Sequence, residues 1–302
     1  MKVPAHLQVG VCTHTGWVRT NNEDDFLLGS LPAPGAFFVG IADGMGGLAG
    51  GAEASRTALR AAATMVLDTA KGQALAQRVE AGFVAAGRRV YEASQAVPAL
   101  RDMGTTLTLL CLADDVAVVG HVGDTRLYRV RGGRCEQLTE DHAVRQPDNL
   151  LTRCIGAGQA VVAADHAVHE TAPGDRFVLV SDGVWSVLAE AVFAKLVGKD
   201  APQAAAEALV AAALAQGGPD NATALVVDLR TPAVGAGTAA IAVECDLPRE
   251  ERPEDRLLWP RAKSLRTPFW PWLLWFGGAV LVAHAVLRWC GVERGVVAPF
   301  VG

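Results

Sequence analysis

The chain has 302 residues, of which 51% are hydrophobic and 20% are charged, and this composition excludes a disordered or low-complexity protein. The net charge is −5, and no basic run precedes the C-terminal region, which excludes a surface built to bind nucleic acid. The six cysteines form no C-x-x-C pair, so we predict neither a zinc site nor a disulfide framework, and a reducing cytosol fits the chain.

The first residues, MKVPAHLQVG, contain no uninterrupted apolar run. A signal peptide needs such a run, so we expect the N-terminal part of the chain to stay in the cytoplasm.

Residues 1–230 alternate patterned apolar runs with Gly- and Asp-rich turns, as expected for one folded domain. The predicted strands are 7–13, 25–28, 36–42, 105–112, 116–122, 126–130, 134–138, 166–170, 177–181 and 222–229. The predicted helices are 53–69, 73–96, 187–197 and 201–215. Strands and helices each come in runs, which favours an antiparallel α+β layered domain over alternating β-α-β units.

Beyond residue 230 the folded pattern breaks down. Residues 231–267 combine small residues, prolines and charges, which indicates a flexible, charged linker. Residues 268–290 are predicted to form a transmembrane helix, because 269–287 carries no formal charge over nearly the length that crosses a bilayer. A buried core helix is the alternative, although no remaining sequence could cover it. Residues 291–302 are predicted to be a short tail.

Charges and aromatic residues around this span suggest its orientation. Tryptophans lie at its start and just beyond its end, as interfacial aromatics do. Four basic residues precede the span and two follow it: Arg256, Arg261, Lys263 and Arg266, then Arg288 and Arg294. The positive-inside rule therefore predicts a single-pass protein of a bacterial inner membrane with its folded domain in the cytoplasm.

Five Asp-bearing turns lie at the ends of predicted strands. They are NED (22–24), ADGMGG (42–47), VGDTR (122–126), SDG (181–183) and PDN (219–221). A single Asp-Gly pair is usually a plain turn, so the signal is the number and order of these motifs. Carboxylates that converge at one sheet edge repel each other unless a cation neutralises them. Oxygen ligands without His or Cys favour Mg²⁺ or Mn²⁺ over zinc.

The order of the motifs resembles the metal-dependent, type 2C family of serine/threonine protein phosphatases over nearly all of residues 7–229. The resemblance is carried by RTNNED (19–24), ADGMGG (42–47), GTT (104–106), VGDTR (122–126), LTEDH (138–142), LTRCIG (151–156), SDGVW (181–185) and DNAT (220–223). It implies an αββα sandwich, in which two antiparallel sheets are flanked by helix pairs. The transmembrane helix would follow this domain.

The resemblance also implies a site that holds two Mn²⁺ or Mg²⁺ ions. Asp43 would bridge the ions, and the Gly44 carbonyl would bind one of them. The other implied ligands are Glu23 and Asp24 on one side, Asp182 and Asp220 on the other, and Asp124 with Asp182 at a weaker third site.

Arg19 is implied to bind the substrate phosphate with its forked guanidinium. A water that bridges two ions would then attack the phosphorus of phosphoserine or phosphothreonine, with Asp43 central to catalysis. The implied partners are phosphoprotein substrates and a Ser/Thr kinase, or a secretion-system component, at the membrane. No nucleic acid is expected. The sequence specifies no oligomeric state.

Three features depart from the family pattern, and one matching residue, His142, has an expected structural role. Met45 stands where many relatives have a histidine proposed to protonate the leaving group, so we expect a metal-bound water in that role. Ser186 replaces an acidic residue near the third site; it could weaken that site, cap the N-terminus of a helix, or do both. Residues 143–150 are shorter than the usual flap, which predicts a more open cleft. His142 is expected to make a structural hydrogen bond rather than act in catalysis.

Three other functions were weighed against the phosphatase. A pseudophosphatase that only binds partners would lack metal ligands, yet Asp43, Asp182 and Asp220 are all present. A nuclease-like metal hydrolase would need a basic track. A membrane scaffold with a purely structural metal would have no use for Arg19.

Overall fold

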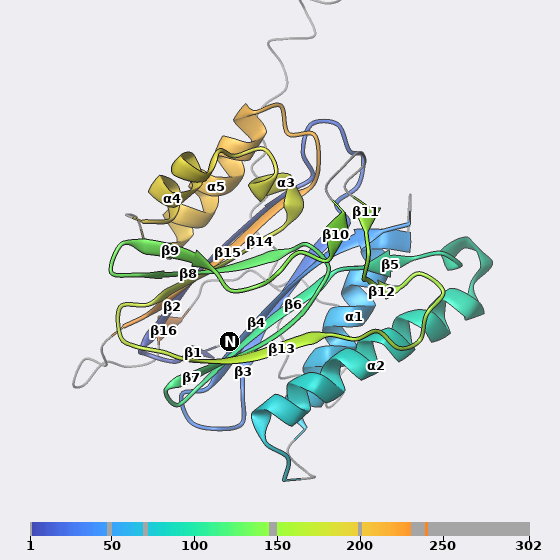
Figure 1. Ribbon diagram of the computed structural model, residues 1–302, viewed down its shortest axis with the longest axis horizontal. Coiled ribbons are helices and arrows are strands. Elements are labelled where there is room, and N and C mark those ends of the chain that lie inside the picture. Colours follow the sequence, from blue (N-terminus) through green and yellow to red (C-terminus); the bar gives the residue numbers. More distant parts are fainter. Residues whose placement is uncertain are drawn as a thin grey trace, which may run out of the picture. The chain divides into compact units, whose positions relative to one another are not determined.

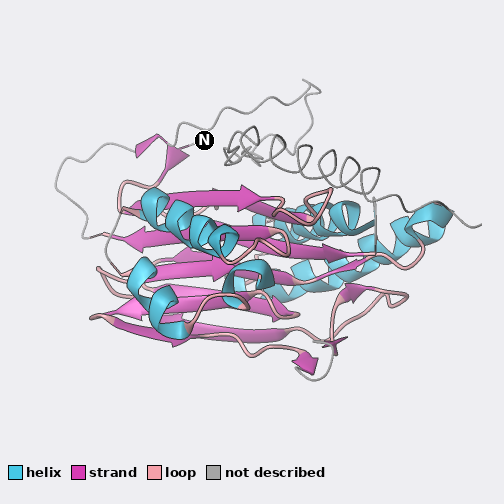
Figure 2. Cartoon of the chain, turned by 90° about the horizontal axis from the view of Figure 1, so that it is seen from above, coloured by secondary structure: helices cyan, strands magenta, loops and turns pink. Residues whose placement is uncertain are grey.

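A computed structural model of the chain describes residues 2–46, 50–68, 72–144, 150–198, 201–230 and 239–240. Two antiparallel sheets stack on each other, and helices cover the outer face of each (Figure 1). Figure 2 shows the strands of both sheets running in similar directions between the helical layers. The described residues therefore form an α+β sandwich, as the sequence predicted.

The larger sheet has seven strands and the smaller has five. The seven-stranded sheet has the order β12-β5-β4-β6-β7-β13, with β3 also paired to β4. Its strands are β3 (Asp24–Ser30), β4 (Phe37–Met45), β5 (Gly104–Thr105), β6 (Leu107–Ala113), β7 (Val116–Val122), β12 (Ile155–Gly156) and β13 (Asp165–Glu170). The five-stranded sheet, in its order, contains β2 (Leu7–His14), β15 (Ala222–Leu229), β14 (Arg176–Val180), β8 (Arg126–Arg131) and β9 (Arg134–Gln137).

Two short strand pairs lie outside the main sheets. β10 (Ala143–Val144) pairs with β11 (Leu150–Leu151), and β1 (Lys2–Val3) pairs with β16 (Ala239–Ala240). The second pair brings two residues of the predicted linker beside the N-terminal strand.

The helices separate into two groups by the sheet that they cover. α1 (Gly50–Leu67) and α2 (Leu75–Ala96) pack on the seven-stranded sheet. α4 (Glu190–Val197) and α5 (Pro202–Ala215), with the one-turn α3 (Asp182–Trp185), lie on the side of the five-stranded sheet. A short 3-10 helix, η1 (Pro98–Leu100), follows α2.

Strand β4 contributes side chains to both hydrophobic cores of the sandwich. Phe37 and Phe38 are adjacent and both fully buried, yet they belong to different clusters, because successive strand residues point to opposite faces. Phe37 packs between the sheets with residues such as Phe177 and Leu225. Phe38 packs under α1 and α2 with Leu59 and other residues. A strand covered on both faces reads as one continuous apolar run, as 36–42 does.

Most predicted elements are confirmed with small shifts at their ends, and β7 and β15 have the predicted bounds. Two differences affect the site. β4 continues to Met45, so Asp43 lies on a strand and not in a turn after it. The predicted helix 187–197 begins only at Glu190, because a separate turn of helix forms first at Asp182–Trp185.

The predicted membrane span 268–290 lies outside the described residues, as do 231–238, 241–267 and the tail 291–302. Among the residues that the structure does describe, no helix combines the length and apolar character of a membrane span.

Gly10 sets how closely α5 approaches the five-stranded sheet. A Cβ at Gly10 would lie 2.2 Å from the backbone carbon of Pro202, at the start of α5. We therefore expect Gly10→Ala to lower the free energy of unfolding by about 1–3 kcal/mol, because the helix must shift to avoid the clash. Urea unfolding of the variant and the wild type measures this difference.

Gly198→Ala is the matched control, since its Cβ would meet its nearest neighbour at an ordinary 3.4 Å. If both variants unfold at the same urea concentration, close packing of α5 against β2 does not limit stability.

Candidate active site

Five aspartates gather where the two sheets share an end. Asp24 opens β3 and is paired in register with Asp43 on β4. Asp182 opens α3 two residues after the end of β14, Asp220 lies two residues before the start of β15, and Asp124 follows β7. We call Asp24, Asp43, Asp124, Asp182 and Asp220 the acidic cluster. The charges of the other four all act on Asp43, so the structure brings these predicted residues together.

The GTT motif fixes the backbone of Asp43 on both sides. The Asp43 amide donates a hydrogen bond to Thr106 Oγ1 at 2.8 Å. Its carbonyl accepts bonds from Thr105 Oγ1 and from the Thr106 amide, both at 2.9 Å. Both threonines are buried, so the position of the Asp43 Cα is set by groups that carry no charge.

Asp24 is buried with one oxygen paired and the other orphaned. Ser181 Oγ donates to Asp24 Oδ2 at 2.7 Å and itself accepts the Thr223 amide at 3.0 Å. Asp24 Oδ1 is buried without any hydrogen-bond partner. Burial, above all, raises the pKa of Asp24 to about 7 despite the Ser181 bond. A buried carboxylate oxygen without a partner fits a group that would bind a cation, or a water molecule bound to that cation.

Asn221 joins the loop between β2 and β3 to the loop before β15. Its Oδ1 accepts the Glu23 amide at 2.8 Å, and its Nδ2 donates to the carbonyls of Thr15 at 2.8 Å and Asn21 at 2.9 Å. Asn221 had no predicted role beyond its place in the DNAT motif. The signal that could identify it is an amide beside a predicted ligand, since only an amide can both accept and donate here.

Glu23 is placed close to the start of α1 by tight backbone packing. The Gly44 amide donates to the Glu23 carbonyl at 3.1 Å, and a Cβ at Gly44 would lie 2.1 Å from the Gly51 carbonyl oxygen. Only glycine fits at residue 44, which leaves the backbone beside Asp43 open to close approach. Burial raises the pKa of Glu23, Arg19 opposes this shift, and Asp220 adds to it.

The backbone of Asp124 is held by Trp185, whose ring stacks with Arg126. Trp185 Nε1 donates to the Asp124 carbonyl at 2.9 Å, and the guanidinium of Arg126 lies 3.5 Å above the Trp185 ring. Arg126 also makes a forked ion pair with Asp141, whose side chain is 6% exposed, with Nη2 2.7 Å from Oδ2. Burial and the nearby Asp182 raise the pKa of Asp124 to about 7.

His142 has the structural role that the sequence predicted. Its Nδ1 accepts the Gly123 amide at 3.1 Å, so its proton lies on Nε2, 3.0 Å from Asp165 Oδ2. It is buried, and both ring nitrogens are occupied by the protein. His142 therefore supports the backbone next to Asp124.

Ser186 does not cap the N-terminus of a helix, and that interpretation was wrong. It is exposed at the C-terminal end of α3, where its amide donates to the Asp182 carbonyl at 2.9 Å. The acidic turn at Asp182 itself winds into helix, which moves the first helical turn upstream of Ser186.

Residues 145–149, at the tip of the β10–β11 hairpin, lie outside the described residues, so the expected openness of the cleft stays a prediction.

The electrostatics of the acidic cluster call for a cation. Burial and the neighbouring aspartates raise the pKa of Asp43 well above its ordinary value. Burial and Asp220 likewise raise the pKa of Asp182, although a hydrogen bond with Asp43 opposes this. Two carboxyl groups can share such a bond only when one holds a proton, and a divalent ion can take that proton's place.

In the part of the chain that the structure describes, no three His, Cys, Asp or Glu side chains are already arranged around one point as an ion site. Mg²⁺ usually keeps several waters and takes only one or two carboxylates, so the cluster suits hydrated ions of this class. The oxygen-only donor set also fits Mn²⁺.

Arg19 borders the acidic cluster on its solvent side. Its Nη2 lies 2.8 Å from Asp220 Oδ2, and about half of its side chain is exposed. One nitrogen of the Arg19 guanidinium is thus bound at the cluster, while the side chain stays accessible to solvent. This is where a phosphate-binding guanidinium was predicted.

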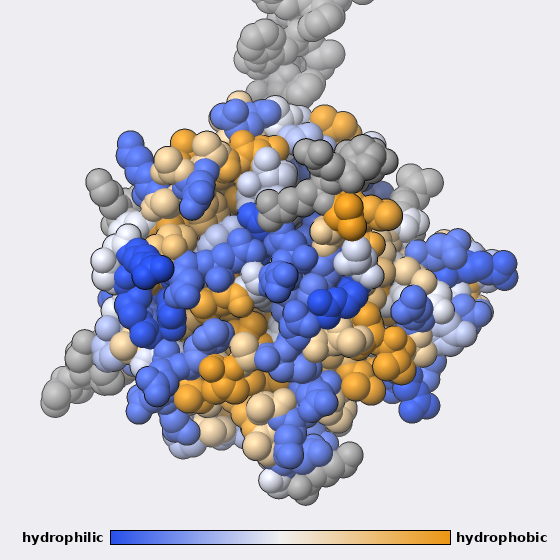
Figure 3. Space-filling view, viewed as in Figure 1, coloured by the Kyte–Doolittle hydropathy of each residue, from blue (hydrophilic) through white to orange (hydrophobic). Residues whose placement is uncertain are grey.

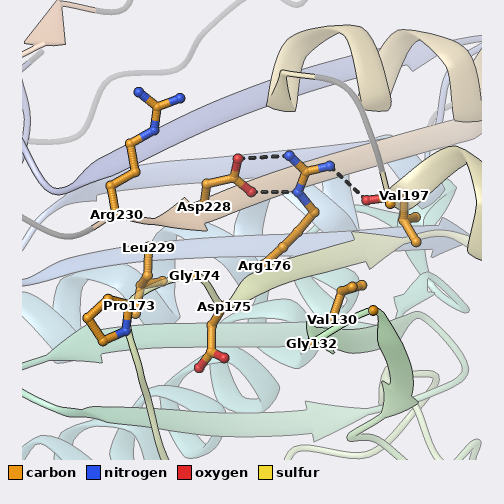
Figure 4. Close-up of a pocket in the computed structure, with 12 residues that line it drawn as sticks. Val130, Gly132, Pro173, Gly174, Asp175, Arg176, Val197, Asp228, Leu229 and Arg230 are labelled. Atoms are coloured by element: carbon orange, nitrogen blue, oxygen red, sulfur yellow. Dashed lines mark hydrogen bonds and ion pairs between the residues drawn. The ribbon is translucent and has the colours of Figure 1, made fainter.

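A cavity of about 450 Å³ lies at the other end of the five-stranded sheet (Figure 4). It is lined by the start of β14 and the end of β15, whose opposite ends lead to Asp182 and Asp220. Within it, Arg176 makes a forked ion pair with Asp228 and donates to the Val197 carbonyl at 2.7 Å. Since these charges neutralise each other, the cavity lacks the unpaired acidic character of the cluster.

Comparison with known proteins assigns a family. Residues 18–216 match the family model of Protein phosphatase 2C. The serine/threonine protein phosphatase PstP of Mycobacterium tuberculosis is 29% identical over 249 residues, which are 76% of this chain and 46% of PstP. The chain thus matches about half the length of that relative.

Two solved structures extend the likeness to the fold. PppA of Pseudomonas aeruginosa, described as a key regulatory component of T6SS, is 32% identical with a TM-score of 0.63, over 74% of this chain and 97% of PppA. The catalytic domain of PstP in complex with two manganese ions is 30% identical with a TM-score of 0.66, over 74% of this chain and 99% of that domain.

The raised pKa values predict how stability depends on pH when no metal is bound. Asp24 and Asp124 keep their protons up to about pH 7 in the folded chain, whereas an unfolded Asp loses its proton near pH 3.9. Between about pH 4 and 7 the folded state therefore binds more protons, and stability falls as pH rises, by at most about 1.4 kcal/mol per pH unit for each carboxyl. Thermal unfolding in EDTA should show Tm decreasing from about pH 5 to about pH 7.5.

Millimolar Mg²⁺ should raise Tm more at the higher pH. There the carboxyl groups of the cluster lose their protons, and the ion can bind to the carboxylates that result. A shallower slope is expected for Asp124→Asn, which lacks one of the titrating groups. A Tm in EDTA that rises over this range would contradict the prediction.

Asn221 should affect metal affinity without being a ligand. In Asn221→Ala the Glu23 amide and two carbonyls lose their partner, so Glu23 is no longer held in place. We expect Mn²⁺ affinity to fall about 10- to 100-fold, as for other supporting residues of metal sites. Isothermal titration calorimetry measures it.

Gln203→Ala is the matched control, because Gln203 also bridges an amide and a carbonyl of one β2 residue, Val11, each at 3.0 Å. It should alter stability but leave Mn²⁺ affinity as in the wild type. Equal affinities in both variants would show that Asn221 does not position the site.

Proposed function

This chain belongs to the protein phosphatase 2C family, and we propose that it hydrolyses phosphoserine and phosphothreonine on proteins in a metal-dependent reaction. The observation that carries the proposal is the acidic cluster, in which burial and the neighbouring aspartates raise the pKa of Asp43 and of Asp182, with an exposed arginine at its rim. A binding module would gain nothing from keeping such mutually repelling charges.

We assign the metal ligands as the sequence implied them. Asp43 lies between the other members of the acidic cluster and would contact two ions, with Asp24 and Glu23 on one side and Asp182 and Asp220 on the other. When bound, two Mn²⁺ or Mg²⁺ ions would supply positive charge for the phosphoryl oxygens and lower the pKa of water. The manganese-bound structure of the PstP catalytic domain supports two such ions here. A weaker third ion at Asp124 is part of the same proposal.

The protein's own residues would orient the substrate. The Arg19 guanidinium has a fork that matches two phosphate oxygens, and its present partner Asp220 is one of the proposed ligands. If Asp220 held an ion, Arg19 would lose part of that attraction and would be available to the phosphate. No described Ser or Cys is required as a nucleophile in this arrangement.

We propose further that residues 268–290 tether the domain to the cytoplasmic face of a bacterial inner membrane. The support is the uncharged stretch 269–287 with its flanking tryptophans and basic residues. Tethering would raise the local concentration of phosphorylated membrane proteins, such as a Ser/Thr kinase. A secretion-system component is a further candidate substrate, since the similar PppA is described as a regulatory component of T6SS.

The test is phosphate release from a phosphothreonine peptide by the full chain, with and without Mn²⁺. Asp43→Asn keeps the shape of the side chain but removes its charge, so we expect kcat to fall at least about 100-fold. Asp115→Asn, at an exposed position on a turn, is the isosteric control and should keep its activity. A folded wild-type chain that is inert with both Mn²⁺ and Mg²⁺ would overturn the proposal in favour of a binding module.

A further inference from the structure

Two apolar side chains directly precede the proposed phosphate-binding arginine and face solvent. Trp17 is 43% exposed and Val18 is 69% exposed, although apolar residues of this size are usually buried. We call Trp17 and Val18 the apolar pair. Figure 3 shows hydrophobic residues in separate patches among hydrophilic ones, so exposure alone does not distinguish them. Trp17 and Val18 are distinguished by their position next to Arg19 in the sequence.

Trp17 of the apolar pair is held rigidly to its surroundings. The Trp17 amide donates to the Gly218 carbonyl at 2.8 Å, and Trp17 Nε1 donates to the Leu214 carbonyl at 3.1 Å. The His14 ring packs edge-on against the indole at 4.9 Å. The Trp17 ring therefore has a fixed orientation on the end of α5, with part of its surface left open.

The same loop is tied to the acidic cluster at its next residue. Arg19 bonds Asp220, two residues beyond Gly218, so the apolar pair and the arginine share one support. A rigid aromatic with its polar end satisfied loses little entropy when it binds an apolar group, which is why such residues dominate the binding energy of interfaces.

We propose that the apolar pair is a specificity subsite for an apolar side chain next to the phosphorylated residue of the substrate. The inference rests on the proposed function, because it takes Arg19 as the phosphate clamp. Neighbouring Cα atoms are about 3.8 Å apart, and extended residues rise about 3.3 Å each. A side chain one or two positions from the phosphothreonine can therefore reach the apolar pair while the phosphate contacts Arg19.

The exposed apolar surface makes the occupant more specific. A segment with apolar neighbours around the phosphothreonine gains burial against Val18 and the open part of the indole. A segment with Ser in those positions gains the phosphate contact alone. The subsite thus favours phosphorylated segments that are Leu-, Ile- or Val-flanked.

The experiment uses the full chain and two phosphothreonine peptides that differ only in the residues before and after the phosphothreonine, Leu in one and Ser in the other. For the wild type with Mn²⁺, kcat/KM should be higher for the Leu peptide. In Val18→Ser the ratio of the two kcat/KM values should fall about five- to tenfold, as expected for losing the burial of one or two methyl groups. Val168→Ser, at a 58% exposed valine on β13, should keep the wild-type ratio.

Several outcomes decide the inference. An unchanged ratio in Val18→Ser overturns it. So does a wild type that sediments as a dimer while Val18→Ser sediments as a monomer, because the apolar pair would then be covered by a second copy. If neither peptide is hydrolysed, the proposed function fails, and calorimetric binding decides the subsite. In that case the Leu peptide must bind more tightly than the Ser peptide in the wild type, and Val18→Ser must remove the difference.

Discussion

The repulsion among buried carboxylates at one end of the sandwich is the constraint on which the rest of the site depends. Asp43 lies in the field of four other aspartates, and burial removes the water that would otherwise screen them. The folded chain can relieve this repulsion only by holding protons or by binding cations. Metal binding and folding stability are therefore linked in this protein, since a bound cation offsets the negative charge of the acidic cluster.

Neutral groups hold two of the proposed ligands, Asp43 and Glu23, in place. Asp43 is fixed through its backbone by Thr105 and Thr106, and Glu23 through its amide by Asn221. Three forked ion pairs of the five-stranded sheet do not include a member of the cluster. Arg126 pairs with Asp141 behind Trp185, and Arg131 with Asp175 and Arg176 with Asp228 lie toward the far end. Arg19, by contrast, pairs with Asp220 itself, where a bound cation would compete with it.

The sequence predicts the layers well, because burial on one or two faces of an element sets the spacing of its apolar residues. β7 and β15 were predicted with the observed bounds, and the ordered acidic motifs identified the residues of the cluster. It predicts less well where a polar residue has a non-local partner. Ser186 looked like a cap because the turn of helix at Asp182 depends on tertiary contacts. The role of Asn221 depends on carbonyls that lie about 200 residues away in the sequence.

In the proposed mechanism, Arg19 would tie metal binding to phosphate binding through one carboxylate. Without cations the acidic cluster repels a phosphate dianion, and Arg19 is held by Asp220 at 2.8 Å. A cation held by Asp220 would reduce both obstacles, because it would weaken the attraction of Asp220 for Arg19 and offset the negative charge of the cluster. The two ligands must then favour each other to the same degree, so phosphate should also tighten the metal. The apolar pair adds a contact that does not depend on charge. Such a contact lets the site distinguish among phosphorylated segments whose phosphates are identical.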